Sequence, residues 1–181
     1  MRRGNRKVKL LIGAGIIVFA AIKYCSSAEV NPYTGEKQHI ALNEDQEIAM
    51  GLQAAPQMTQ QHGGLHPNEK YQAFVKDVGN RLVNNSIAKQ TGYIYDFHLL
   101  ADQKTINAFA LPGGQIFITY ALFSKLKNED QLAGVLGHEI AHVIGRHSAE
   151  RMANHGLMEG VLNGVAVGFD PTTAKGAAAI A

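Results

Sequence analysis

The run His138-Glu139-Ile140-Ala141-His142 constrains this chain more than any other part of its sequence. It lies in a segment that opens at Asn128, a good helix cap followed by acidic residues at the positive end of the helix dipole. We therefore predict one helix from Asn128 to about His155, ended by Gly156. Because an α-helix turns about 100° per residue, residues four apart lie one turn from each other on one face.

That spacing suits a metal ion. Two imidazoles one turn apart can reach a single tetrahedral Zn²⁺ at about 2.0–2.1 Å. Glu139 lies on the flank of the same face, where it can take a proton from a zinc-bound water without binding the metal itself. We predict His138 and His142 as zinc ligands and Glu139 as the catalytic base. The plainer alternative is a surface helix with two unrelated histidines.

The remaining positions of the predicted helix divide in the same way. Small residues share the histidine face, and apolar residues cluster on the opposite side. These are Gly134, Ala141, Gly145 and Ala149 on the first face, and Leu132, Leu136, Ile140, Val143 and Ile144 on the second. On a straight helix His147 falls almost opposite His138, so we predict a structural or supporting role for it. The tenth residue after His138 is Ser148, which excludes a third histidine ligand there.

The N-terminus has the features of a membrane-targeting segment. Five basic residues in the first nine positions precede an uninterrupted apolar run, Leu10 to Ile22. This order is typical of a secretory signal or a signal anchor. The run is shorter than the roughly 20 residues that span a bilayer, although flanking lysines can snorkel and extend it. Cleavage after Ala28, retention as an anchor and lipidation of Cys25 remain open, and all three predict a domain across or against a membrane.

Composition narrows the functional class. The 181 residues suit one domain, and 46% hydrophobic with 18% charged residues indicates a folded chain. The net charge of +2 comes from the N-terminal tail, and no basic patch is interleaved with aromatic residues, so nucleic-acid binding is not expected. Cys25 is the only cysteine, which excludes an internal disulfide and a cysteine-based zinc site.

Elsewhere the pattern predicts an α+β domain. Helices are expected from Asn43 to about Gln61 and from Asn68 to about Asn84. The aromatic and aliphatic stretch Tyr93 to Ala101 predicts a strand. Residues Asn107 to Phe123 predict two short strands joined by Pro112-Gly113-Gly114. Residues 29–42 contain turn signals without a period and predict a linker. His62 and His66 flank a break between the first two helices and are expected to be solvated.

Three segments carry a resemblance to a known family: NPYTGEKQHIALNEDQEIAMG, NAFALPGGQIFITYALF and GVLGHEIAHVIGRHSAERM. Together, over about residues 31–160, they resemble the membrane-linked zinc peptidases related to HtpX, Oma-type and CAAX prenyl proteases, closest to their periplasmic bacterial branch. The resemblance implies a zincin-like (gluzincin) fold, zinc ligands at His138 and His142, and a catalytic base at Glu139. It also implies a place in the cell envelope, periplasmic or membrane-anchored.

The resemblance also implies a third zinc ligand, a glutamate on a later helix. Residues 156–181 resemble the apolar stretch before that helix, and their only acids are Glu159 and Asp170. Neither lies in a recognisable ligand helix, so the third ligand stays unknown and we expect the sequence to stop short of it. Whether this chain is active by itself is therefore left open, and the missing ligand favours the non-catalytic alternative for this polypeptide. The predicted organisation is a signal or anchor at 1–28, a linker at 29–42, a partial peptidase domain at 43–160 and an apolar tail at 161–181.

The predicted function is zinc-dependent hydrolysis of peptide bonds, in misfolded or envelope proteins by the family resemblance. The Asn107–Phe123 hairpin offers an edge strand along which an extended peptide can pair. The alternative is a binding or assembly factor that keeps the peptidase fold without catalysis. A small structural membrane protein with a chance motif is a further alternative, and it would bind no stoichiometric zinc. The natural substrate and the oligomeric state are left open.

Overall fold

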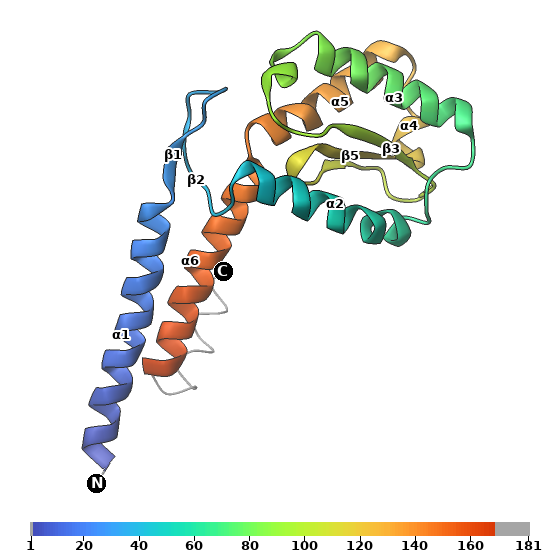
Figure 1. Ribbon diagram of the computed structural model, residues 1–181. Helices are drawn as coiled ribbons and strands as arrows, with labels where there is room; N and C mark the ends of the chain where they lie inside the picture. The colour runs from blue at the N-terminus through green and yellow to red at the C-terminus, as the bar shows by residue number, and fades with distance from the viewer. Residues whose placement is uncertain (1, 169–181) are drawn as a thin grey trace. The chain divides into compact units, whose positions relative to one another are not determined.

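The computed structural model describes residues 2–168, which form two compact units (Figure 1). As far as they are described, the helical unit comprises residues 2–30, 36–41 and 150–168, and the mixed unit comprises residues 31–35 and 42–149.

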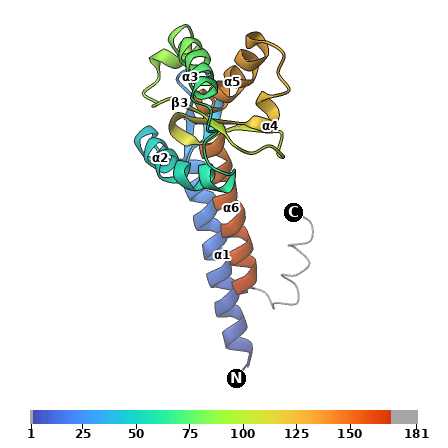
Figure 2. The same cartoon turned by 90° about the vertical axis from the view of Figure 1, so that its right-hand side faces the viewer.

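The helical unit contains α1 (Arg2–Ser26) and most of α6 (His147–Gly168), which run side by side (Figures 1 and 2). Small residues allow the close approach: a Cβ added to Gly164 would lie 2.4 Å from Cγ1 of Ile17, and one on Gly160 would lie 2.3 Å from Cβ of Ala20. The Tyr24 hydroxyl donates a hydrogen bond to Oδ1 of Asn154 at 2.8 Å. Backbones that approach this closely tolerate only small side chains at the contact.

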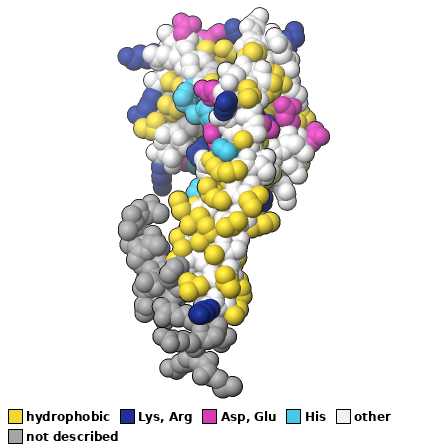
Figure 3. All heavy atoms as spheres, turned by 90° about the vertical axis from the view of Figure 1, so that its left-hand side faces the viewer, with side chains coloured by type: hydrophobic (Ala, Val, Ile, Leu, Met, Phe, Trp, Pro, Cys, Tyr) yellow, Lys and Arg dark blue, Asp and Glu magenta, His cyan; other side chains and the backbone are white. Residues whose placement is uncertain are grey.

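Within α1, the 20 residues Lys7–Ser26 are long and apolar enough to cross a membrane, with a mean hydropathy of 1.9 over an 18-residue window. A signal sequence has the same properties. Apolar side chains gather along the helical unit in Figure 3. Helix α1 is longer than the apolar run from Leu10 to Ile22, because the basic residues before that run are also helical.

The segment predicted as a linker contains two short strands. β1 (Ala28–Val30) pairs antiparallel with β2 (Lys37–His39), with Ala28 opposite His39. Between the strands, the Asn31 side chain accepts hydrogen bonds from the backbone N–H groups of Tyr33 and Thr34. The predicted turn is thus confirmed, but strands of three residues carry too little periodicity to be recognised in the sequence.

Two helices of the mixed unit begin and end where the sequence predicts them. α2 (Glu44–Gln61) has Asn43 as its cap, and Asn43 and Gln46 form a complete capping box. α3 (Glu69–Asn84) is capped by Asn68, whose side chain accepts from the N–H groups of Lys70 and Tyr71. A 3₁₀ turn, η1 (Ile87–Gln90), leads toward the sheet.

The sheet has three strands in the order β3-β5-β4. β3 (Asp96–Leu100) is parallel to the fully buried β5 (Gln115–Thr119), and β4 (Ala108–Ala110) is antiparallel to β5 at the edge. The turn η2 (Pro112–Gly114) joins β4 to β5, as predicted. Residues Tyr120–Phe123 were expected to continue the strand, but they form the short helix α4, because the Thr119 side chain caps the N–H of Leu122.

The predicted α+β class is confirmed. In Figures 1 and 2, α3 and α5 (Glu129–Ile144) cover one face of the sheet and α2 lies on the other. The core lies between α3, α5 and the sheet, and it includes Val75, Val78, Phe97, Leu99, Ile116, Ile118, Leu132, Leu136 and Ile140.

The predicted single helix from Asn128 to His155 is wrong. α5 ends at Ile144, and α6 begins at His147. Between them Arg146 has a φ of 54°, the only positive φ at a non-glycine residue in the part of the chain that the structure describes. A right-handed helix cannot continue through that conformation, so α5 and α6 are separate helices.

Candidate active site

The apolar face of helix α5 packs in the hydrophobic core, and this packing places the predicted site on the opposite face. Leu132, Leu136 and Ile140 are at most 4% exposed and pack in the hydrophobic core, as predicted. The start of the helix is fixed by Asn128, whose side chain accepts from the N–H of Gln131. With the apolar stripe buried, the opposite stripe faces outward, and His138 is exposed.

The two histidines of the motif face each other. Nε2 of His138 lies 3.1 Å from Nε2 of His142, with the ring planes 81° apart. Two nitrogens bound tetrahedrally to one zinc ion at 2.0–2.1 Å would lie about 3.3 Å apart. The spacing of this pair therefore fits a shared metal ion with only a small adjustment.

Glu139 lies beside the pair but is buried, with 7% of its surface exposed. Burial raises the pKa of its carboxyl above the ordinary value, and the nearby His138 opposes this and lowers it. A carboxylate whose pKa lies closer to neutral holds an abstracted proton better than a fully solvated one does.

An open cleft of about 560 Å³ runs along this face of the mixed unit. His138 and Glu139 line it together with the edge strand β4 and apolar side chains. The other lining residues are Ile106, Asn107, Ala108, Leu122, Leu126, Gln131, Gly134 and Val135. Gly134 was predicted to keep the histidine face open, and a Cβ added to it would meet nothing within 4 Å.

His147 does not lie where the straight-helix argument placed it. Its Nδ1 is in hydrogen-bond contact with Nδ1 of His142, and the two ring centroids are 4.8 Å apart. The break at Gly145 and Arg146 removes the rotation that would have turned His147 away. The supporting role predicted for His147 therefore has a geometry that the sequence did not reveal.

A third metal ligand is not identified. Between residues 2 and 168 no group of three or more His, Cys, Asp or Glu side chains could hold a metal ion. Glu159 is exposed on α6, and Asp170 lies outside the described residues. The loop histidines take part in other contacts: His62 Nδ1 is 2.9 Å from Oδ2 of Asp102, and His66 stacks on Tyr120.

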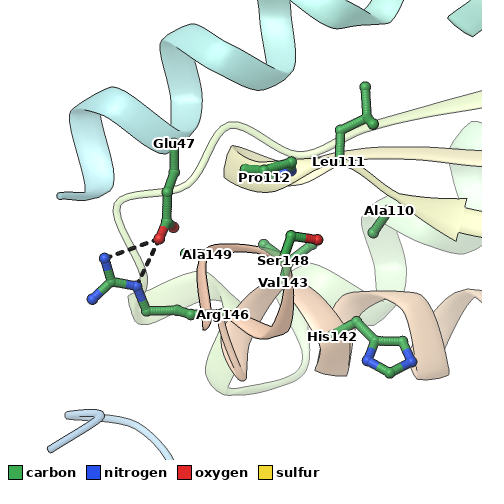
Figure 4. A pocket seen from close by; sticks show the side chains of 9 residues that line it. All are labelled: Glu47, Ala110, Leu111, Pro112, His142, Val143, Arg146, Ser148 and Ala149. Carbon is green, nitrogen blue, oxygen red and sulfur yellow. Dashed lines mark hydrogen bonds and ion pairs between the residues drawn. The ribbon is translucent and has the colours of Figure 1, made fainter. Parts of the chain in front are cut away.

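A buried ion pair, which no pattern in the sequence predicts, lies next to the site (Figure 4). Glu47 of α2 and Arg146 are only 2% and 7% exposed, and Oε1 of Glu47 is 3.0 Å from Nε and 2.9 Å from Nη2 of Arg146. The Tyr93 hydroxyl donates to Oε2 of Glu47 at 2.6 Å. Burial raises the pKa of Glu47, and the hydrogen bonds from Tyr93 and Arg146 oppose that rise.

These two residues also line a small pocket with His142. Glu47 lies in the first turns of α2, four residues before Gly51, and both residues are buried. The partner of Glu47 lies 99 positions away, so no local pattern could identify it.

Known proteins resemble this chain over most of its length. Residues 69–177 match Peptidase family M48. The chain is 33% identical over 145 residues to the beta-barrel assembly-enhancing protease of Escherichia coli (strain K12), covering 80% of this chain and 29% of that protein. It is 30% identical over 149 residues to the mitochondrial metalloendopeptidase OMA1 of Schizosaccharomyces pombe, covering 80% of this chain and 41% of that protein.

The chain thus spans less than half the length of these curated relatives. The match nevertheless covers most of the chain, including the cleft and the helix that carries the paired histidines. The resemblance noted from the three sequence segments is thereby confirmed: the chain belongs to peptidase family M48.

Proposed function

We propose that this chain carries the catalytic centre of a zinc-dependent metalloendopeptidase with a zincin-like arrangement of helix and edge strand. In this proposal His138 and His142 hold the metal, Glu139 is the catalytic base, and the peptidase domain extends over residues 43–160. The observation that carries the proposal is the 3.1 Å approach of the two Nε2 atoms beside a buried carboxylate in an open cleft. Membership of family M48 supports the same chemistry.

The residues of the site divide the work of hydrolysis. When bound, a zinc ion supplies a Lewis acid that polarises the scissile carbonyl and acidifies water. Glu139 takes the proton of the attacking water and passes it to the leaving amine. Its pKa, raised by burial, favours the protonated carboxyl that the second of these steps requires.

The cleft suits an extended polypeptide. β4 lies at the edge of the sheet and lines the cleft through Ala108, so a peptide can add beside it through backbone hydrogen bonds. The apolar wall formed by Ile106, Leu122 and Val135 favours apolar side chains of the substrate. Recognition of this kind depends little on sequence and suits unfolded or misfolded proteins of the envelope.

Localisation follows from α1, which we propose anchors the chain at a membrane of the cell envelope. One relative supports this placement, since its name describes a protease that enhances beta-barrel assembly. The segment Lys7–Ser26 has the length and hydropathy that such an anchor requires.

Hydrolysis of casein by the purified protein tests the proposal. We expect Glu139→Gln to lower the rate by about 10²–10⁴-fold, the usual contribution of a general base, while one zinc per chain remains bound. His138→Ala should lose the zinc as well. Unchanged hydrolysis in Glu139→Gln would refute the role of Glu139.

The alternative of a non-catalytic binding or assembly factor predicts a different result. A wild-type protein that holds one zinc but releases no peptide at any substrate concentration would support it. The retained Glu139 does not favour this alternative, because a pure binding module has no use for a buried carboxylate beside its metal ligands.

A further inference from the structure

The strongest feature that the proposed mechanism leaves unused is the turn between α5 and α6, together with the buried ion pair that holds it. We infer that Gly145, Arg146 and His147 form a positioning device for the metal ligand His142. His147 accepts a hydrogen bond from Nδ1 of His142, which fixes the ring and keeps the lone pair of the metal ligand on Nε2. The inference rests on the proposed function only for the identity of the metal.

The tautomer argument starts from the two nitrogens of His142. A neutral imidazole carries one N–H donor and one acceptor. Nε2 of His142 faces Nε2 of His138 at 3.1 Å, and Nδ1 contacts Nδ1 of His147. A ligand nitrogen must keep its lone pair, so the proton of His142 belongs on Nδ1, and Nδ1 of His147 is the acceptor. His147 then carries its own proton on Nε2.

The backbone of the turn makes this contact possible. Five residues along a straight helix would rotate His147 by about 140° from His142, out of reach of its ring. Instead Gly145 is the cap of α5, Arg146 has a φ of 54°, and His147 starts the next helix. The left-handed conformation is unfavourable for arginine, so the surrounding contacts must impose it.

Those contacts come from α2 and the residue before its cap. Arg146 is bound to Oε1 of Glu47 through both Nε and Nη2, and Nη2 also donates to the Leu42 carbonyl at 2.7 Å. Tyr93 occupies the other oxygen of Glu47. A charged pair buried this deeply is stable only when its hydrogen bonds are well satisfied, and here both partners have several. The guanidinium is therefore fixed, and the backbone of Arg146 is fixed with it.

Gly145 has a separate part in the device. A Cβ at this position would lie 2.6 Å from Nε2 and 3.0 Å from Cδ2 of His147. Any side chain larger than hydrogen would therefore push the His147 ring away from His142. The same Cβ would lie 3.0 Å from the Ala141 carbonyl oxygen. Glycine is therefore required by these neighbours and not by its own φ of −70°, which is available to every residue.

The direct test is the tautomer of His142 in the metal-free protein, read from two-bond ¹H–¹⁵N correlations of ¹⁵N-histidine-labelled protein at a pH where the ring is neutral. His142 is assigned by the signal missing in His142→Gln. We expect the Nδ1–H tautomer in the wild type and a shift toward Nε2–H in His147→Ala. The matched control is His155→Ala, which removes an exposed histidine of the same helix and should leave the tautomer unchanged.

Zinc affinity gives the second readout, measured by competition with a chromophoric chelator. Loss of a hydrogen bond that orients a ligand weakens metal binding by about 10–100-fold, and we expect this range for His147→Ala and for Gly145→Ala, with no change in His155→Ala. Gly145→Ala keeps every hydrogen-bonding group, so it also serves if His147→Ala does not fold.

The inference is overturned if wild-type His142 is already protonated on Nε2, or if both variants bind zinc as the wild type does. Its failure is distinguishable from failure of the proposed function. A protein with the expected tautomer and zinc affinities but no proteolysis would keep the positioning device and lose the peptidase. An active protease in which His147→Ala leaves the His142 tautomer unchanged would keep the peptidase function and refute the positioning device.

Discussion

At the scale of single residues, the site combines residues whose positions can be predicted from the sequence with residues whose positions cannot. The four-residue spacing of His138 and His142 determines one face of a helix, so their approach was predictable from the sequence. His147 was not, because its position depends on a left-handed Arg146 held by Glu47 from 99 positions away. A local pattern cannot report a conformation that a distant side chain imposes.

The raised pKa of Glu139 predicts how the stability of the folded protein depends on pH. Because burial raises its folded pKa above the unfolded value, its stabilising contribution is present below about pH 4.5 and is lost as the pH rises through the folded pKa. In metal-free protein, Glu139→Gln should therefore raise the urea midpoint at pH 7 and have little effect near pH 4. The exposed Glu159→Gln serves as control and should change neither. An equal gain at both pH values would contradict the assignment of the raised pKa.

At the scale of elements, the starts of the capped helices were predicted to within about one residue, whereas short elements were not predicted. Asn43 and Asn68 are the N-caps of α2 and α3, and their side-chain hydrogen bonds go to residues nearby in the sequence, so the starts of both helices are predictable. The failures share a different cause. β1 and β2 are too short to show a period, and Tyr120–Phe123 have strand-like residues but follow a capping threonine.

The small residues of α5 lead to a prediction about the cleft. A Cβ on Gly134 or on Gly137 would meet nothing within 4 Å, so alanine at either should stabilise the helix by about 0.5–1 kcal/mol. Only Gly134 lines the cleft. We therefore expect Gly134→Ala to raise the KM for casein several-fold while Gly137→Ala leaves it unchanged, with stability measured by urea unfolding. Equal KM values in the two variants would place the substrate elsewhere.

At the scale of the whole molecule, the question left by the sequence is whether α1 stays attached. Cleavage after Ala28 would cut β1 at its first residue and separate the pairing of Ala28 with His39. It would also remove Tyr24, whose hydroxyl bonds Asn154 and whose carbonyl accepts from Nδ1 of His39 at 2.8 Å. A disposable signal has no need of such contacts with the chain that follows it.

We therefore predict that α1 is retained. The intact mass of the protein recovered from membranes should include residues 1–28, and the protein should resist extraction by alkaline carbonate. A mature N-terminus at Glu29 would contradict the prediction, and release by carbonate with α1 intact would show that the helix does not anchor the chain.

The pairing of Glu47 with Arg146 also has a consequence for the order of events during folding. Closing a contact between residues 99 positions apart costs chain entropy that only the assembled core can offset. The turn that orients His142 is thus completed only after α2, the sheet and α5 have come together. We expect a nascent or partly folded chain to hold its two histidines loosely, so that competence to capture the metal arises last and marks a finished domain.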